Sequence, residues 1–237
     1  MIVAIDGPAG SGKSSLSRAL AKSTDFVYLD TGAMYRALTL YCLENGINVH
    51  SQSSVEQAAQ DIDVRFGDAV ASEDPELGQN VFLNGKEVTR DIRTSQIDEN
   101  VSIVALYPGV RSAMVARQRS FANQRNIIAE GRDIGTAVFP EAEIKIFLSA
   151  DAQQRALRRT IEREGGDPTK PGAAVKDEQL YEKIYADMLQ RDAIDEERTE
   201  SPLKPASDAI HLDTTHLTLD QAVDKVRSLI IQKTASL

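Results

Sequence analysis

The sequence predicts an α/β protein in which helices cover both faces of a parallel sheet, giving three layers. Short apolar, β-prone segments alternate with segments of helical periodicity along most of the 237 residues. Such alternation is typical of parallel strands that are joined by helical crossovers. A glycine-rich turn at residues 7–12 joins the first apolar segment to the first helical one, which places a turn at the carboxyl end of a buried strand.

The expected strands are short apolar runs that end at polar or turn residues. They lie at residues 2–5, 26–29, 127–129, 144–148 and 209–212. The expected helices carry apolar residues three and four positions apart. They follow the glycine-rich turn and then lie near residues 33–44, from 53 onward, 95–123 with a break near Pro108, 152–163, 175–191, and after Thr218. Ser53 with Glu56, and Thr218 with Gln221, match the capping box that opens a helix.

The helical period fades between residues 62 and 94. Residues 63–66 alternate polar and apolar side chains, and Asn84-Gly85 separates the β-prone runs 81–83 and 86–88. Asn-Gly between two such runs predicts a hairpin with a type I′ turn. We therefore expect a small antiparallel β insert at residues 62–94, and a core built from residues 1–61 and 95–237.

Composition excludes several classes of protein. The net charge of -9 argues against general electrostatic binding to nucleic acid, for which a basic face is expected. No apolar run approaches the ~18 residues needed to cross a bilayer. Cys42 is the single cysteine, so an internal disulfide is impossible, and we expect it to be a small buried hydrophobe on a helix. The first residues lead directly into a strand, so we expect no secretory signal and a cytoplasmic protein.

One segment matches the phosphate-binding pattern G-x-x-x-x-G-K-[ST] without a mismatch: Gly7-Pro8-Ala9-Gly10-Ser11-Gly12-Lys13-Ser14. A predicted strand precedes it and a predicted helix follows, which is the context that the pattern requires. The glycines let backbone N–H groups turn toward anionic oxygens, and the helix N-terminus adds its positive dipole end. Lys13 brings a mobile positive charge to the β- and γ-phosphates, and the Ser14 hydroxyl is a candidate Mg²⁺ ligand. The sequence lacks Asn-Lys-x-Asp, which would read guanine, so ATP is favoured over GTP.

A second polar segment, residues 30–36, follows the second strand and opens a helix. Ligands of parallel sheets bind at the carboxyl ends of strands. Thr31 lies at the expected helix N-cap, and Arg36 follows about one and a half turns later. Both are candidates for an acceptor site. The alternative roles are a simple helix cap for Thr31 and a surface arginine for Arg36.

A third polar segment, residues 130–135, follows another strand and opens toward the same edge of the sheet. Arg132 is a candidate for binding phosphate. Asp133 is suited either to accept a hydrogen bond from an amino group or to order a metal-bound water. Glu130 serves either the Mg²⁺ shell or a neighbouring arginine, and an ion pair within the loop is the alternative for Arg132 and Asp133.

Positive charge gathers locally in this acidic chain, as expected of a protein that handles phosphate. Arginines concentrate in two stretches, residues 117–132 and 155–163. Arg191, Asp195 and Arg198 are spaced by four and three residues, so on a helix they share one face. That face is either part of a site or a charge ladder on a solvated surface.

Taken together, these segments resemble the bacterial cytidylate kinases, a family of nucleoside monophosphate kinases. The matching blocks run in order along essentially the whole chain, at residues 5–13, 29–36, 91–93, 130–136, 138–140, 145–148, 191–192 and 202–206. Many P-loop proteins share the first block, whereas the blocks at 29–36 and 130–136 together are far more specific. The resemblance implies the P-loop NTPase fold with a β insert in the monophosphate-binding region and a mobile helical lid at about residues 151–172.

The resemblance also implies the reaction. The γ-phosphoryl group of ATP passes to CMP or dCMP with Mg²⁺, giving ADP and CDP or dCDP, in a monomer. The residues implied for ATP are Gly7, Pro8, Ala9, Gly10, Ser11, Gly12, Lys13, Ser14, Ser15, Arg155, Arg158 and Arg159. Those implied for CMP are Thr31, Tyr35, Arg36, Ser102, Arg111, Arg132, Asp133, Arg191, Asp195 and Arg198. Lys13, Arg132 and Arg191 are implied as catalytic.

Two other functions remain open at this point. One is a related P-loop kinase that acts on UMP or on a hydroxyl group of another small metabolite. The other is a non-catalytic nucleotide-sensing module whose β insert binds a protein. An assay of ADP release with several acceptors separates all three functions.

Overall fold

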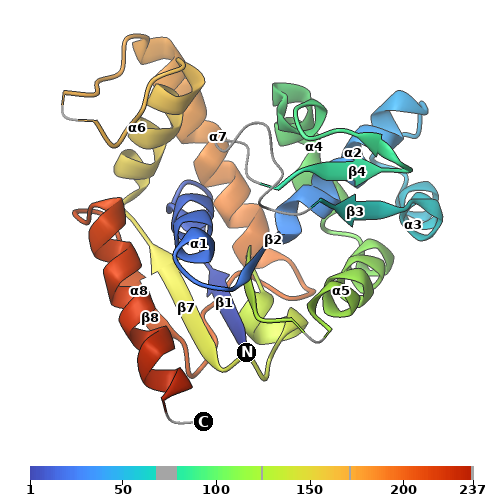
Figure 1. Ribbon diagram of the computed structural model, residues 1–237. Helices are drawn as coiled ribbons and strands as arrows, with labels where there is room; N and C mark the ends of the chain where they lie inside the picture. Colours follow the sequence, from blue (N-terminus) through green and yellow to red (C-terminus); the bar gives the residue numbers. More distant parts are fainter. Residues whose placement is uncertain (68–78, 124, 171, 236–237) are drawn as a thin grey trace. The chain divides into compact units, whose positions relative to one another are not determined.

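The computed structural model describes residues 1–67, 79–123, 125–170 and 172–235 (Figure 1). It contains a mostly parallel sheet flanked by helices and a small antiparallel sheet, so the predicted α/β class is confirmed. Contacts divide the chain into two compact units. The first comprises Met1–Thr24 and Glu130–Leu237, and the second comprises Asp25–Ala129.

In the first unit, the glycine-rich turn lies at the carboxyl end of a buried parallel strand. The strands β1 (Ile2–Asp6), β7 (Ile144–Ser149) and β8 (Ile210–Asp213) are adjacent in that order. Asp6 at the end of β1 is level with Phe147 of β7. The middle of β1 is fully buried, as expected for a strand covered on both faces.

The helices of this unit are α1 (Lys13–Lys22), α6 (Ala152–Arg163), α7 (Glu178–Glu197) and α8 (Leu219–Thr234). The helix α1 packs against α8, which also contacts β7, and α6 packs against α7 (Figure 1). The predicted capping box of α8 is confirmed, because Thr218 and Gln221 exchange both hydrogen bonds.

The structure corrects the expected bounds of the helix at residues 175–191. It begins later, because the Asp177 carboxylate accepts the N–H of Leu180 and so caps α7. It continues to Glu197, because Ala193 and Ile194 interrupt the charged run without disfavouring a helix.

In the second unit, helices and a small sheet enclose one apolar core. Its helices are α2 (Thr31–Glu44), α3 (Gln52–Asp61), α4 (Ser95–Val104) and α5 (Pro108–Ala122). The strand β2 (Val27–Asp30) lies next to β6 (Ile127–Gly131), whose last two residues belong to the first unit. Apolar side chains from all four helices and from the small antiparallel sheet form the core. Cys42 of α2 is buried in it, as predicted.

The expected hairpin is confirmed. In the antiparallel sheet β3 (Val64–Phe66), β4 (Val81–Leu83) and β5 (Lys86–Glu87) are adjacent in that order. The turn between β4 and β5 has positive φ at both central residues, Asn84 (49°) and Gly85 (83°), which is the signature of type I′. Residues 68–78 of the predicted insert lie outside the described residues, and the bounds 62–94 stay a prediction.

Two predicted helix starts are wrong. Asp30, not Thr31, caps α2, because its carboxylate accepts the N–H of Ala33 at 3.0 Å while Thr31 is already helical. The helix α3 begins at Gln52 without the predicted Ser53–Glu56 box. Glu56 instead accepts the N–H of Gly109 at the start of α5, at 2.9 Å. The break predicted near Pro108 is confirmed, because α4 ends at Val104 and α5 begins at Pro108.

Within the residues that the structure describes, no helix is long and apolar enough to cross a membrane.

The turn after β1 predicts a contrast between two glycine variants. An added Cβ at Gly7, where φ is +150°, lies 2.1 Å from the carbonyl oxygen of Leu148, so Gly7→Ala is expected to destabilise the protein by on the order of 4 kcal/mol. An added Cβ at Gly12, where φ is +90°, meets no described atom within 4 Å, so Gly12→Ala costs only about 1–2 kcal/mol of left-handed strain. Urea unfolding of both variants measures the difference, and equal losses contradict the prediction.

Candidate functional site

The predicted phosphate loop, residues 7–14, joins β1 to α1. Gly10 and Gly12 have φ values of +73° and +90°, which other residues rarely adopt. Gly12 is the N-cap of α1, and Lys13 and Ser14 form its first turn. The helix N-terminus therefore presents backbone N–H groups and the positive end of its dipole at the loop.

Lys13 is a buried cation that is held against the loop. Its ammonium group donates a hydrogen bond to the carbonyl of Pro8 at 2.6 Å. Burial, reinforced by Arg132 and Arg191, lowers the pKa of Lys13 well below its usual value, whereas Glu130 and Asp6 act in the opposite direction. An ammonium group has two further donors, and a polyphosphate anion supplies the negative charge that stabilises its protonated form.

Asp6, at the end of β1, holds the segment that carries Arg132 and Asp133. Its two carboxylate oxygens accept the N–H groups of Ile134 and Gly135, each at 2.7 Å. These amides open a π-helical turn at Ile134–Val138. Burial raises the pKa of Asp6 to about 6, although both amide hydrogen bonds lower it. Sequence reasoning gave Asp6 no role, and its position at the end of a buried strand was the available signal.

A buried cluster of two arginines and two aspartates occupies the same unit. Arg132 Nε lies 2.9 Å from Asp195, and Arg198 lies 3.7 Å from Asp195 and 3.6 Å from Asp133. Asp133, Asp195 and Arg198 are each less than a tenth exposed. Burial raises the pKa of Asp195, but Arg132, Arg191 and Arg198 outweigh that effect and hold it below its usual value. The residues predicted from two distant sequence segments are thus brought together.

The helix α7 carries two of the three residues that were expected to share a helix face, and the third follows it. Arg191 and Asp195 are helical, whereas Arg198 is the C-cap residue in an extended conformation. The predicted common helix face is therefore only partly correct. Arg198 still reaches Asp195, and its Nε donates to the carbonyl of Ser201 at 2.6 Å.

The three predicted lid arginines lie on α6 and have different partners. Arg155 is buried and donates to the carbonyl of Ala9 at 2.9 Å and to Asp192 at 2.5 Å. Arg158 donates to the carbonyl of Thr214 at 2.7 Å, and Arg159 lies 3.4 Å from Glu162. Arg155 is thus hydrogen-bonded to the phosphate loop. Residue 171 of the predicted lid lies outside the described residues.

In the second unit, the predicted acceptor residues lie on three helices. Arg36 of α2 forms an ion pair with Asp98 of α4 at 2.5 Å and donates to the carbonyl of Ile92 at 3.1 Å. The Arg111 guanidinium of α5 lies 5.9 Å from the centre of the Tyr35 ring, within reach of a cation–π contact. The structure places Thr31, which is buried, on α2 and Ser102 on α4. Sequence reasoning missed Asp98.

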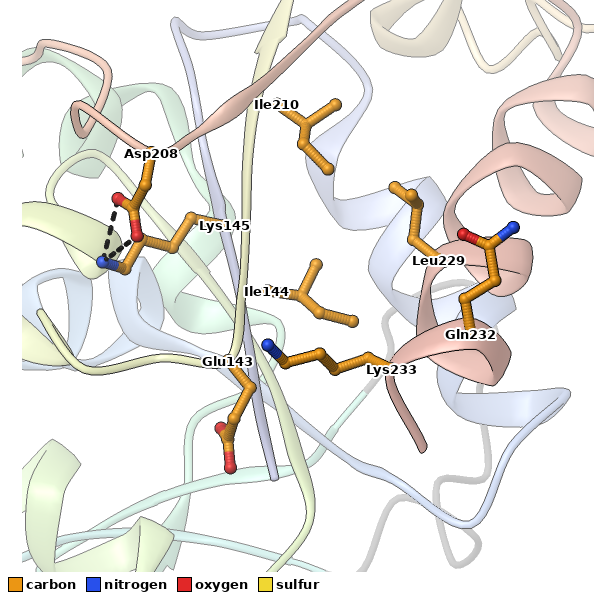
Figure 2. A pocket seen from close by; sticks show the side chains of 8 residues that line it. All are labelled: Glu143, Ile144, Lys145, Asp208, Ile210, Leu229, Gln232 and Lys233. Carbon is orange, nitrogen blue, oxygen red and sulfur yellow. Dashed lines mark hydrogen bonds and ion pairs between the residues drawn. The ribbon is translucent and has the colours of Figure 1, made fainter. Parts of the chain in front are cut away.

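A separate pocket of about 280 Å³ lies at the amino end of β7, at the opposite end of that strand from the phosphate loop (Figure 2). Ile144, Ile210 and Leu229 form its apolar wall. The nearby Lys145 and Asp208 are paired with each other at 2.8 Å. The described residues that line this pocket include none that we predicted to bind a substrate.

A phosphate loop after a buried parallel strand, with Lys13 and a set of arginines beside it, defines a P-loop phosphotransferase. The comparisons with known proteins are specific. The cytidylate kinase family model matches residues 3–232. A cytidylate kinase of Anoxybacillus flavithermus is 42% identical over 231 residues, which cover 98% of this chain and 96% of the relative. One of Fusobacterium nucleatum is 44% identical over 230 residues, which cover 97% of each chain. The chain belongs to the cytidylate kinase family.

The raised pKa of Asp6 predicts a pH dependence of stability. The pKa of Asp6 is about 6 in the folded protein, whereas its ordinary value is 3.8, so the folded state binds the proton more tightly than the unfolded state. The resulting contribution to the free energy of unfolding is fully present below pH 3.8 and is lost as the pH rises through 6. Between pH 5.5 and 7.5 the wild type should lose on the order of 1 kcal/mol more unfolding free energy than Asp6→Asn. Urea unfolding at both pH values measures it, and parallel losses contradict it.

Proposed function

We propose that this protein transfers the γ-phosphoryl group of ATP to CMP or dCMP, forming ADP and CDP or dCDP. One observation carries the proposal. A phosphate loop with a buried lysine and a buried arginine–aspartate cluster share one compact unit, in a chain of the cytidylate kinase family. The relatives described above are all named cytidylate kinases. Such an enzyme belongs to pyrimidine metabolism.

The donor side of the proposal is the phosphate loop with the arginines of α6. The residues proposed to bind ATP are Gly7, Pro8, Ala9, Gly10, Ser11, Gly12, Lys13, Ser14, Ser15, Arg155, Arg158 and Arg159. The loop supplies backbone N–H donors, and Lys13 supplies charge at the transferring phosphoryl group. A lid at about residues 151–172 is proposed to exclude water, because water in the site would hydrolyse ATP.

Magnesium is proposed to enter with ATP. Mg²⁺ prefers hard oxygen ligands and usually combines substrate phosphates, water and one or two protein groups. The residues present fit this requirement, since the Ser14 hydroxyl lies in the first turn of α1. The buried carboxylates Asp6 and Glu130 lie near Lys13 and partly oppose the lowering of its pKa. Ser14 would therefore hold the ion, which neutralises phosphate charge when bound.

The acceptor side of the proposal follows the family resemblance. The residues proposed to bind CMP are Thr31, Tyr35, Arg36, Ser102, Arg111, Arg132, Asp133, Arg191, Asp195 and Arg198. Among these, Arg36, Arg132 and Arg198 are assigned to the acceptor phosphate, and Arg191 and Asp195 to the ribose. Arginine suits a phosphate because its planar fork of N–H donors matches two phosphate oxygens at once.

Base selection follows from hydrogen-bonding chemistry. Cytosine presents an amino donor beside a ring-nitrogen and a carbonyl acceptor. A carboxylate such as Asp133 accepts from the amino group, and Ser102 and Arg111 donate to the two acceptors. Uracil presents a carbonyl where cytosine has the amino group, so UMP would place an acceptor against the Asp133 carboxylate.

Catalysis in this proposal rests on charge and position. Phosphoryl transfer places negative charge on the equatorial oxygens and needs no covalent intermediate on the protein. Lys13, Arg132 and Arg191 are the proposed catalytic residues, and their charges lie close enough together to lower the pKa of Lys13. We further propose a cytoplasmic monomer, on the family resemblance and the composition alone.

The proposed reaction predicts a pattern of acceptors. With ATP and Mg²⁺, a coupled assay of ADP formation should show rapid turnover with CMP or dCMP, and much slower turnover with UMP and AMP. Removing Mg²⁺ with a chelator should abolish the activity with CMP. ADP release with UMP or AMP but not with CMP contradicts the proposed acceptor, and no release with any acceptor contradicts a kinase.

Base selection predicts the behaviour of Asp133→Ala. Loss of one buried hydrogen bond to the cytosine amino group should lower kcat/KM for CMP by about tenfold to a hundredfold, and UMP should be affected far less. The preference for CMP over UMP should therefore collapse. Asp208→Asn, at an exposed aspartate paired with Lys145, is the control. An unchanged preference in Asp133→Ala rules out base reading by this residue.

A further inference from the structure

We propose that Thr214, together with the Arg155–Asp192 pair, positions the phosphate loop by holding two of its backbone carbonyls. Through these contacts the three residues act on the loop backbone and not on the reacting atoms. They act by fixing the orientation of the loop peptides that precede Gly10 and Gly12. The inference rests on the proposed function, because it assumes that the loop binds ATP.

Thr214 is buried directly after β8 and connects the loop to the end of β7. Its hydroxyl lies within hydrogen-bond distance of two carbonyl oxygens, that of Ser11 at 3.0 Å and that of Ser149 at 3.1 Å. Its backbone N–H donates to the same Ser149 carbonyl at 2.8 Å. Arg158 holds the Thr214 carbonyl at 2.7 Å. The hydroxyl is therefore fixed in place beside Ser11 by the strand, the backbone and an arginine.

The second contact with the loop backbone is at Ala9. Arg155 donates to the Ala9 carbonyl at 2.9 Å, and the Asp192 carboxylate both pairs with Arg155 at 2.5 Å and accepts the Ala9 N–H at 3.3 Å. Arg155 and Asp192 are each less than a tenth exposed. The backbone of Ala9 is thus held at its N–H and at its carbonyl by one ion pair.

The held carbonyls precede Gly10 and Gly12, which have φ values of +73° and +90°. A peptide unit is planar and trans, so its carbonyl and the N–H of the next residue point in opposite directions. Holding the Ser11 carbonyl therefore orients the N–H of Gly12, and holding the Ala9 carbonyl orients the N–H of Gly10. Glycine lacks a Cβ and resists rotation of the adjacent peptide least. These two peptides are the ones that most need an external hold.

Two other carbonyls of the loop accept hydrogen bonds from donors close by in the sequence. The Pro8 carbonyl accepts from Lys13 and from the Ser11 hydroxyl, and the Gly12 carbonyl accepts the N–H of Leu16 inside α1. Thr214 and Arg155 supply the hydrogen-bond donors for the carbonyls of Ser11 and Ala9. The N–H groups of Gly10 and Gly12 are thereby held on the side opposite these carbonyls, whereas the Ala9 N–H donates to Asp192.

Thr214→Val tests the proposal, because valine keeps the shape and removes the hydroxyl. It should weaken binding of a non-hydrolysable ATP analogue with Mg²⁺, measured by calorimetry without any acceptor, by about threefold to tenfold. KM for ATP should rise by a similar factor, whereas KM for CMP should stay unchanged. Thr214→Ser, which restores a hydroxyl, should bind the analogue within about twofold of the wild type.

Thr39→Val is the matched control. The Thr39 hydroxyl is also buried and donates to a backbone carbonyl, that of Tyr35 inside α2, at 2.8 Å. This control should lower the melting temperature about as much as Thr214→Val while leaving analogue affinity unchanged. If Thr214→Val fails to fold, Asp192→Asn supplies the same readout, because it weakens the hold on Ala9 while preserving side-chain shape.

The proposal is overturned if Thr214→Val, or Asp192→Asn in its place, binds the ATP analogue as the wild type does. It is also overturned if KM for ATP and KM for CMP rise together, or if Thr214→Ser fails to restore affinity. Failure of the proposed function looks different. In that case the wild type binds the analogue but phosphorylates neither CMP nor dCMP, and the comparison of Thr214 variants still decides the role of this residue.

Discussion

Buried charge is the constraint around which the first unit is organised. Lys13, Asp133, Asp195 and Arg198 are each less than a tenth exposed, and an unpaired charge in such surroundings costs several kcal/mol. The structure meets this constraint in the cluster by pairing, because Asp195 lies between Arg132 and Arg198. The charge of Lys13 is only partly offset by Glu130 and Asp6, and its pKa is lowered. A chain with a net charge of -9 can concentrate positive charge in this way only where acidic groups or anionic ligands balance it.

The same constraint explains why side chains hold several carbonyls of the loop. A loop that offers its N–H groups to an anion must place its carbonyls elsewhere, because an unsatisfied buried carbonyl is itself costly. Side chains from the loop itself, α1, α6 and the segment after β8 serve this purpose. The loop sequence therefore specifies only half of the phosphate site, and the surrounding elements specify the rest.

This division determines what the sequence could predict. Strand and helix order, the type I′ turn at Asn84-Gly85 and the capping box at Thr218 all follow from local chemistry, and the structure confirms them. The start of α3 was wrong, because Glu56 bonds to the distant Gly109 rather than to a local amide. The cap of α2 was assigned to Thr31 because threonine and its neighbour Asp30 both suit that position. Only the backbone conformation distinguishes them.

The candidate site was likewise predictable only in part. The motif identified the loop and Lys13, and family resemblance assigned roles to the arginines, which remain predictions. The aspartates that hold these groups were missed. Asp98 lies in no matching block, and Asp6 and Asp192 lie in matching blocks but received no role. Partners of these three aspartates lie between 37 and 183 residues away in the chain. Pairing over such separations depends on tertiary structure, which periodicity and spacing do not encode.

The buried position of Cys42 has a practical consequence for spectroscopy. Burial raises the pKa of its thiol to about 11, so at neutral pH only about one molecule in ten thousand carries the reactive thiolate. As the sequence has no second cysteine, a thiol-reactive dye or spin label should attach almost exclusively to a cysteine introduced at an exposed position. The natural chain is thus already a suitable background for fluorescence and electron paramagnetic resonance measurements on α6 or on the hairpin, without prior removal of a native thiol.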